Sequence, residues 1–156
     1  MKRRPTRLKD FDYSSNGVYF LTICTDKRIN YLSRINGDNL TLTPIGIIVE
    51  KQLLDLEKRF NNLSIVAYVI MPNHIHMLLE LSSIGGASPS PTITDIICAF
   101  KSLATKNVKK EFSTIKLFQR SFYDHVIRDE DDYLIRLNYI LENPLKWVLD
   151  ELYVKD

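Results

Sequence analysis

Residues 69–81, VIMPNHIHMLLEL, constrain the fold most, because they are predicted to form two antiparallel strands joined by a tight turn. The turn is expected at Pro72 and Asn73, and the second strand begins with His74. Side chains on a strand alternate between the two faces of its sheet. His74 and His76 therefore share one face, and the other face is apolar: Ile75, Met77, Leu79 and Leu81. Other parts of the chain must cover that apolar face.

The rest of the chain has hydrophobic patterns typical of interspersed strands and helices. Alternating or continuous apolar runs predict strands at residues 17–25, 63–71, 74–81 and 121–128. Helical spacing and capping residues predict helices at residues 44–60, from Thr92 or Thr94 to 112, and at 129–143. The pair Asn36 and Gly37 predicts a small additional hairpin between the first strand and the first helix.

The order strand, helix, strand, strand, helix, strand predicts an α+β fold. This order of elements is typical of the ferredoxin-like (RRM-like) fold, which has an antiparallel sheet, and here a C-terminal helix at residues 129–143 is added. The two crossover helices are expected to cover one face of the sheet and to leave the histidine face free. The added helix is the element expected to approach that free face. Its inward residues are predicted to be Leu134, Leu137, Ile140 and Leu141.

The length of 156 residues and the hydrophobic content of 45% favour one domain that spans residues 1–156. Within it, we expect a basic N-terminal arm at residues 1–16 and a mobile loop at residues 82–92. No apolar run approaches the roughly 20 residues that cross a bilayer, and no apolar region follows the N-terminal charges. A cytoplasmic location is therefore expected, with Cys24 and Cys98 as small core residues.

Charge is distributed unevenly along the chain, although the formal net charge is only +2. Residues 1–10 hold five basic side chains and one acidic side chain, and residues 101–128 hold seven basic and two acidic ones. Residues 129–156 reverse the balance, with eight acidic and three basic side chains. Basic segments of this kind can follow the phosphates of a nucleic acid, but they are also common on solvated surfaces. The charge pattern therefore permits nucleic-acid binding without requiring it.

Two pairs of residues are candidates for chemistry. His74 and His76 could bind one divalent ion from a strand, although such a pair could also simply hydrogen-bond at a half-buried surface. Tyr139 and Asn143 lie one helical turn apart, and a phenol near metal-bound histidines is a candidate nucleophile. The alternative is an aromatic residue at the edge of the core and an asparagine at a helix end. Spacing alone leaves both alternatives open.

Three segments resemble, in order and spacing, the signatures of one known family: VIMPNHIHMLLEL, FKSLATK and FQRSFYDHVIRDEDDYLIRLNYILENP. They are similar to those of the single-tyrosine HUH transposases, particularly the REP-associated tyrosine transposase branch, from about Gly17 to Trp147. The resemblance implies a DNA transposase that cleaves and rejoins single-stranded hairpin DNA. The cut would pass through a covalent 5′-phosphotyrosine intermediate and leave a free 3′-hydroxyl. The resemblance also implies Mg²⁺ or Mn²⁺ as the cofactor.

By position in these motifs, the resemblance implies that His74 and His76 bind the metal and that Tyr139 is the nucleophile. Asn143 stands where related enzymes have a glutamine that completes the metal site, and an amide oxygen suits a hard cation. Six basic residues are expected to bind the DNA backbone: Arg3, Arg4, Lys101, Lys106, Lys109 and Arg120. The expected partner is single-stranded or hairpin DNA, with no membrane partner, and the expected location is the cytoplasm in association with the nucleoid. Whether the chain forms a homodimer, and whether Tyr139 serves the histidines of its own chain, is left open.

Other readings remain. A binding module on the same fold that does not cut would need exposed aromatic rings on the free face, where the third strand instead offers imidazoles and Glu80. A hydrolase of the histidine-triad kind would need a third histidine at residue 78, which is leucine. Tyr123 and Tyr133 are alternative nucleophiles but are expected to pack, and His125 is expected to be structural or to contact DNA. Phe118 departs from the tryptophan usual in relatives.

Overall fold

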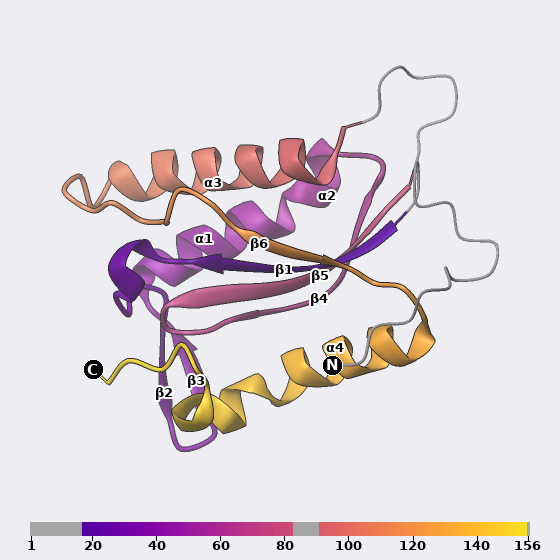
Figure 1. Cartoon of the computed structure of the whole chain (residues 1–156). Helices are drawn as coiled ribbons and strands as arrows, with labels where there is room; N and C mark the ends of the chain where they lie inside the picture. The colour runs from indigo at the N-terminus through magenta and orange to yellow at the C-terminus, as the bar shows by residue number, and fades with distance from the viewer. Residues whose placement is uncertain (1–16, 83–90, 156) are drawn as a thin grey trace.

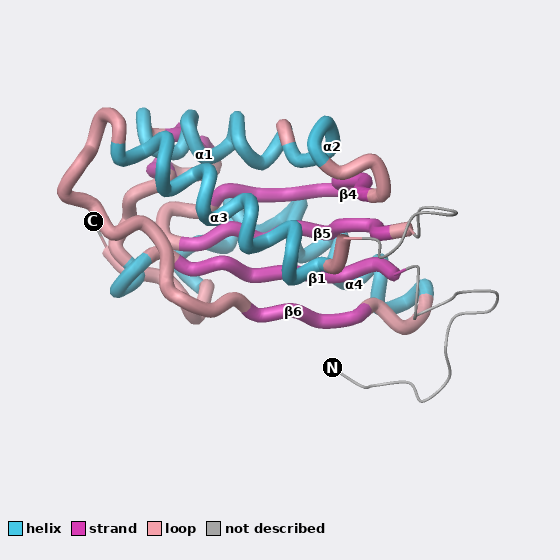
Figure 2. Tube along the Cα trace, turned by 90° about the horizontal axis from the view of Figure 1, so that it is seen from above, coloured by secondary structure: helices cyan, strands magenta, loops and turns pink. Residues whose placement is uncertain are grey.

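The structure, a computed structural model, describes residues 17–82 and 91–155. Its centre is an antiparallel sheet with the strand order β4-β5-β1-β6, which Figure 2 shows from above. The strands are β1 (Gly17–Cys24), β4 (Leu63–Ile70), β5 (His74–Leu81) and β6 (Tyr123–Val126). The order matches the predicted ferredoxin-like arrangement, so the predicted fold class is confirmed. Strand β6 is shorter than the predicted strand at residues 121–128.

A small hairpin stands beside the main sheet. Its strands are β2 (Ser33–Asn36) and β3 (Asn39–Leu42), and they pair only with each other. Gly37 lies in the turn with φ of 63°, a left-handed conformation that glycine adopts without steric cost. The hairpin predicted from Asn36 and Gly37 is therefore confirmed. A short 3-10 turn, η1 (Asp26–Arg28), connects it to β1.

One face of the sheet is covered by the two crossover connections, as Figure 1 shows. They contain α1 (Pro44–Leu54), α2 (Leu56–Arg59) and α3 (Ile93–Lys109). A turn at Asp55 divides the predicted helix at residues 44–60 into α1 and α2. At the start of α3, Thr92, one of the two caps considered from the sequence, forms a reciprocal capping box with Asp95. The core below these helices is apolar and includes Leu21, Ile23, Ile75, Met77, Leu79, Ile97 and Phe100.

The opposite face of the sheet, which the crossover helices leave free, is the face that carries the histidines. It is covered by α4 (Glu130–Glu142) and by the 3-10 segment η2 (Asn143–Leu149), which lie on the other side of the sheet from α1 and α3 in Figure 1. A second, smaller apolar cluster lies between them and the sheet, with Phe20, Leu78, Ile140 and Trp147 among its members. The prediction that the added helix approaches the histidine face is therefore confirmed.

Helix α4 begins where the sequence predicted, but it turns a different face toward the sheet. Asp129 caps it by accepting a hydrogen bond from the backbone N–H of Asp132 at 2.8 Å. Ile140 is buried as predicted, whereas Leu134 is 46% exposed and Leu141 is 65% exposed. The inward placement of Leu134 and Leu141 was wrong, because the helix buries a face that also carries polar residues: Asp132 and Asn143.

Some expectations fall on parts of the chain without described coordinates. The basic arm at residues 1–16, with Arg3 and Arg4, lies outside the described residues, and so do residues 83–90 of the predicted loop. Of the helices in the described ranges, none combines the length and the apolar composition needed to cross a membrane.

Candidate metal and tyrosine site

The two histidines stand side by side at the start of β5, on the face covered by α4. In the pairing with β1, His74 lies opposite Cys24 and His76 opposite Thr22. Their ring centroids are 4.6 Å apart, and the two side chains are almost completely buried. The alternation predicted from the sequence thus brings the two imidazoles together. Burial gives them a dry environment, in which an unpaired nitrogen lone pair is costly.

Asn73 fixes the tautomer of His74. The Nδ2 of Asn73 donates to the carbonyl oxygens of Leu152 at 2.6 Å and Arg28 at 3.3 Å, so its Oδ1 must be the atom that faces His74. This Oδ1 lies 2.8 Å from Nδ1 of His74. Because an amide oxygen only accepts, Nδ1 of His74 carries the proton. In the neutral ring, Nε2 is then left with a lone pair that is available to a cation.

His76 is oriented in a similar way. Its Nδ1 lies 2.9 Å from Oγ1 of Thr22, while its Nε2 is buried without a hydrogen-bond partner among the described residues. Burial, and to a smaller extent the neighbouring His74, lower the pKa of His76 to about 3. The ring is therefore neutral at physiological pH. The neutral form is the one that can bind a metal ion.

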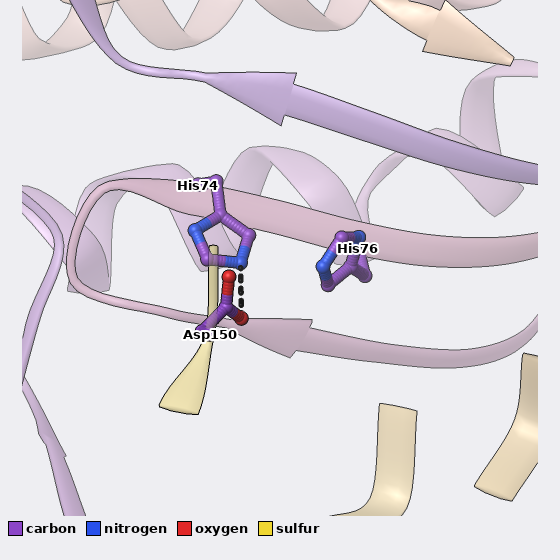
Figure 3. A group of neighbouring side chains, drawn as sticks. All are labelled: His74, His76 and Asp150. Atoms are coloured by element: carbon purple, nitrogen blue, oxygen red, sulfur yellow. Dashed lines mark ion pairs between the residues drawn. The ribbon is translucent and has the colours of Figure 1, made fainter. Parts of the chain in front are cut away.

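A third group, Asp150, lies beside the two rings, as Figure 3 shows. Its Oδ2 is 3.5 Å from Nε2 of His74, and its side chain is 3% exposed. Burial alone would raise the pKa of this carboxyl, but the adjacent His74 side chain and a hydrogen bond from the backbone N–H of Leu152 outweigh it, and the pKa lies below its ordinary value. Asp150 therefore stays ionised. Ligand atoms of His74, His76 and Asp150 all lie within 4.8 Å of one another.

This group of side chains fits a divalent cation. The Nε2 atoms of His74 and His76 are both buried without hydrogen-bond partners in the described parts of the chain, and an ionised carboxylate faces them. Three electron-rich atoms that converge in a dry site repel one another unless a cation or a proton lies between them. Two imidazoles and a carboxylate are a ligand set that several divalent metals accept. The arrangement is thus able to hold a metal ion.

Asp150 was missed by the sequence reasoning, which chose Asn143 as the third ligand. Asp150 follows η2, an irregular segment with no hydrophobic period that would have indicated its direction. Asn143 is also buried, and its Oδ1 lacks a hydrogen-bond partner among the described residues. Both residues line a small cavity of ≈ 410 Å³ together with Tyr139. The amide and the carboxylate are thus both near the phenol.

Tyr139 projects from α4 toward the histidines of its own chain. Its ring centroid is 5.1 Å from that of His76 and 6.0 Å from that of Phe20, and the residue is 41% exposed. Burial raises the pKa of the Tyr139 phenol, and a side-chain hydrogen bond with Asn143 opposes this rise without cancelling it. The phenol is therefore protonated at neutral pH. The same side chain remains open enough for a substrate to reach it.

A larger open pocket lies in front of these side chains, with a volume of ≈ 480 Å³. His76 and Tyr139 line it, and so do Phe20, Arg136 and His125. Its walls come from β1, β5, β6, α4 and the segment after η2. The volume is in the range of ligand sites, and the pocket is open to solvent. A chain of nucleotides or another extended ligand could therefore lie against Tyr139.

The basic residues chosen from the sequence divide into two groups. Lys106, Lys109 and Arg120 line a shallow groove between α3 and the segment before β6. Lys101 lies in the same groove, but its Nζ donates to the backbone carbonyls of Gln119, Arg120 and Ser121 at 2.6, 2.9 and 3.3 Å. These bonds use the three donors of the ammonium group. Lys101 thus fixes the segment before β6, and a contact with DNA stays a prediction.

Comparison with known protein families gives one clear result. A family model described as IS200-like transposase matches residues 49–143, which include both histidines, Tyr139 and Asn143. An uncharacterised protein of Haemophilus influenzae is 32% identical, over 97% of this chain and 93% of that protein. A second protein of the same organism, provisionally named a REP-associated tyrosine transposase, is 27% identical over 86% of this chain and 74% of that protein.

Two solved structures share the fold. One is a REP-associated tyrosine transposase bound to a REP hairpin; it has a TM-score of 0.63 and 19% identity, over 94% of this chain and 73% of that chain. The other is a protein of Deinococcus radiodurans provisionally described as a transposase, with a TM-score of 0.55 and 20% identity, over 92% of this chain and 98% of that chain. At these identities the likeness establishes the arrangement of helices and strands.

Proposed function

The chain belongs to the family of IS200-like transposases, and from that premise we propose that it cleaves and rejoins single-stranded DNA through a covalent bond between Tyr139 and a 5′-phosphate. The observation that carries the proposal is the position of Tyr139, whose ring lies 5.1 Å from that of His76, next to the His74, His76 and Asp150 group. A nucleophile, a candidate cation site and an open pocket meet there within one chain.

His74, His76 and Asp150 would hold Mg²⁺ or Mn²⁺, with Asn143 as a further oxygen ligand or as the partner of the Tyr139 phenol. Oxygen donors suit these hard cations, and imidazole nitrogens make Mn²⁺ the better match of the two. When bound, the ion would polarise the scissile phosphate and offset the negative charge that develops on it. Asn73 and Thr22 would keep the two Nε2 atoms aimed at the ion through the hydrogen bonds at the Nδ1 atoms.

Tyr139 would supply the reacting atom. Its phenolic oxygen attacks the phosphorus of the scissile phosphodiester, the new oxygen–phosphorus bond forms, and the bond to the 3′-oxygen breaks. The phenolic proton leaves Tyr139, and the departing 3′-oxygen gains a proton to become a hydroxyl. A later 3′-hydroxyl attacks the phosphotyrosine and reverses these changes, which restores the phenol and joins two strands. Burial raises the pKa of Tyr139, so the attack also needs a group or a water molecule that accepts the phenolic proton.

The groove formed by Lys106, Lys109 and Arg120 would bind the phosphates of a part of the DNA that is distant from the cleavage site. Hairpin DNA is the substrate form we propose, and the support is the solved relative whose fold this chain shares and which was studied with a REP hairpin. Arg3 and Arg4 are proposed to add to this electrostatic contact. A homodimer stays a prediction; the proposed chemistry needs no second chain, because Tyr139 lies beside the histidines of its own chain.

The test is formation of a covalent protein–DNA adduct. The purified protein is incubated with Mn²⁺ and a hairpin-bearing single-stranded DNA that is labelled on its 3′ portion, and labelled protein is sought on a denaturing gel. We expect an adduct with the unaltered protein and none with Tyr139→Phe, because phenylalanine lacks the attacking oxygen. Tyr133→Phe is the matched control: Tyr133 lies on the same helix and packs in the second apolar cluster, so this variant should keep the adduct.

An adduct that persists in Tyr139→Phe would refute the proposed nucleophile. An adduct that forms equally well in excess chelator would refute the role of the cation group. If the DNA binds without any adduct under these conditions, the binding module that does not cut is the better description.

A further inference from the structure

A second cluster of charged side chains lines the pocket in front of Tyr139, and the mechanism above does not use it. Asp132, on the first turn of α4, is 7% exposed. Its Oδ2 lies 2.7 Å from Nε2 of His125 and also accepts the backbone N–H of Arg128 at 3.2 Å. Its Oδ1 faces Nε of Arg136 at 3.5 Å. One buried carboxylate therefore orients both an imidazole and a guanidinium at the wall of the pocket.

The spacing of α4 aligns these groups with the proposed nucleophile. Asp132, Arg136, Tyr139 and Asn143 follow one another at intervals of four, three and four residues, so they lie along a single face of the helix. Arg136 is thus one turn from Tyr139 on the pocket side. Both residues line the pocket together with His125.

Phe20 holds this arrangement together from the sheet side. The guanidinium carbon of Arg136 lies 5.0 Å from the Phe20 ring centroid, and His76 stacks on the same ring at 5.1 Å. His125 is paired directly opposite Phe20 across β1 and β6, so the two side chains lie on the same face of the sheet. Arg136, His125 and Tyr139 are therefore grouped around one aromatic ring, at the edge of the candidate metal site.

We propose that Arg136 and His125 bind the phosphate adjacent to the scissile phosphate of single-stranded DNA, with Asp132 as the positioning residue for both. The inference rests on the proposed function, since it takes the scissile phosphate to lie at Tyr139. A guanidinium presents several donors in a plane and matches two oxygens of a phosphate. The imidazole of His125 donates through Nε2 to Asp132, and in its protonated form it offers a second donor, Nδ1, to a phosphate oxygen.

The adjacent phosphate fits better than the scissile one. Arg136 lies one helical turn from Tyr139 toward Asp132, with which it pairs, whereas the phosphate at the cut must reach His76 and Tyr139. The two acids that line the pocket do not compete for this position. Asp124 alternates with His125 along β6, so its side chain lies on the other face of the sheet. Glu151 belongs to the segment that follows Asp150, on the metal side of the pocket.

The test is a binding cycle in the Tyr139→Phe background, in which no cut can change the DNA. Hairpin-bearing DNA is prepared with a neutral methylphosphonate in place of one phosphate at a time on both sides of the cleavage site. We expect Arg136→Ala to weaken binding of the unmodified DNA about tenfold and to lower the slope of log K against log salt by about 0.7. On the DNA whose methylphosphonate replaces the phosphate next to the cut, and on that DNA alone, Arg136→Ala should no longer weaken binding.

Matched variants separate contact from packing. Arg136→Lys keeps the charge but loses the planar fork, so it should recover only part of the affinity. His125→Gln and Asp132→Asn should each weaken binding about threefold and should lose that effect with the same methylphosphonate. Lys58→Ala is the control: its exposed lysine lies on α2, across the sheet from the pocket, and affinity should not change.

The inference is overturned if Arg136→Ala has the same effect on every methylphosphonate DNA, or none on the unmodified DNA. Arg136 also packs on Phe20, so the urea midpoint of each variant is measured as well. The inference is also overturned if Arg136→Lys restores no affinity and the affinities of the variants simply follow their stabilities. The adduct assay is independent of this cycle. If an adduct forms but the position-specific effect is absent, the proposed function stands and the phosphate site at Arg136 is refuted. If the position-specific effect is present but no adduct forms, the protein has a phosphate site at Arg136 and the proposed cleavage by Tyr139 is refuted.

Discussion

The two faces of the sheet differ in how completely their buried groups are satisfied. Below α1 and α3, the buried side chains are mostly apolar and fill a continuous core, although Oε1 of Gln52 on α1 also lacks a hydrogen-bond partner among the described residues. Between the sheet and α4, buried polar atoms of the described residues lack hydrogen-bond partners: Nε2 of His74, Nε2 of His76, Oδ1 of Asp132, Nε of Arg136 and Oδ1 of Asn143. Unpaired buried polar atoms destabilise a protein, so their concentration at the candidate site indicates that the α4 face is organised for binding.

The largest expected effect tests the apolar face. Phe100 on α3 is fully buried, and Phe100→Ala should lower the free energy of unfolding by about 3–5 kcal/mol, because it removes apolar contacts and leaves a cavity. Urea unfolding measures the change. The protein that remains folded should bind Mn²⁺ as tightly as the unaltered protein, since the site is on the other side of the sheet. A loss of Mn²⁺ affinity in the folded variant would contradict the conclusion that one face of the sheet provides stability and the other binds the metal.

A second prediction concerns how the unpaired nitrogen of His76 affects the stability of the protein with and without Mn²⁺. His76→Leu replaces an imidazole with an unpaired nitrogen by an apolar side chain of similar size, so the metal-free protein should keep its stability within about 1 kcal/mol. The unaltered protein should gain about 2.7 kcal/mol when Mn²⁺ is present at a hundred times its dissociation constant. The variant should gain almost nothing. Thermal unfolding with and without Mn²⁺ gives both numbers, and an equal gain in the variant would exclude His76 as a ligand.

A third prediction decides between the ligand that the sequence suggested and the one that the structure adds. Asp150→Asn removes a negative charge beside His74, and it should weaken Mn²⁺ binding by at least about tenfold, as loss of a metal partner commonly does. Asn143→Ala should have a smaller effect on affinity, because its amide is shared with the Tyr139 phenol. Calorimetric titration of the metal-free proteins compares them. The reverse order would restore Asn143 as the principal third ligand.

The same comparison explains which features could be predicted from the sequence. Alternation along β5 correctly placed His74 and His76 on one face, because a strand has a fixed period of two residues. Capping residues correctly located the start of α4 at Asp129 and restricted the start of α3 to Thr92 or Thr94, of which Thr92 is the cap. These are local rules, and they do not depend on the distant chain. They also gave the strand order once the pattern of the ferredoxin-like fold was recognised.

What could not be predicted depends on contacts far apart in the sequence. Asp150 reaches His74 only because the segment after η2 lies against the turn before β5, where Asn73 holds it through the carbonyl of Leu152. No local pattern encodes this contact. The basic residue Lys101 was likewise expected to meet DNA, whereas its donors meet backbone carbonyls that become neighbours only after folding.

The orientation of α4 provides the last and smallest predicted effect. The spacing of Leu134, Leu137 and Leu141 suggested an inward apolar stripe, but the helix instead buries Ile140 together with the polar residues of the site. Leu141 is 65% exposed, so Leu141→Ser should change the free energy of unfolding by no more than about 0.5 kcal/mol. Ile140→Ala, one residue away, should cost about 2–5 kcal/mol. Urea unfolding of both variants gives the comparison. Equal losses would mean that α4 is rotated from the position described, and the phenol of Tyr139 would then no longer face His76.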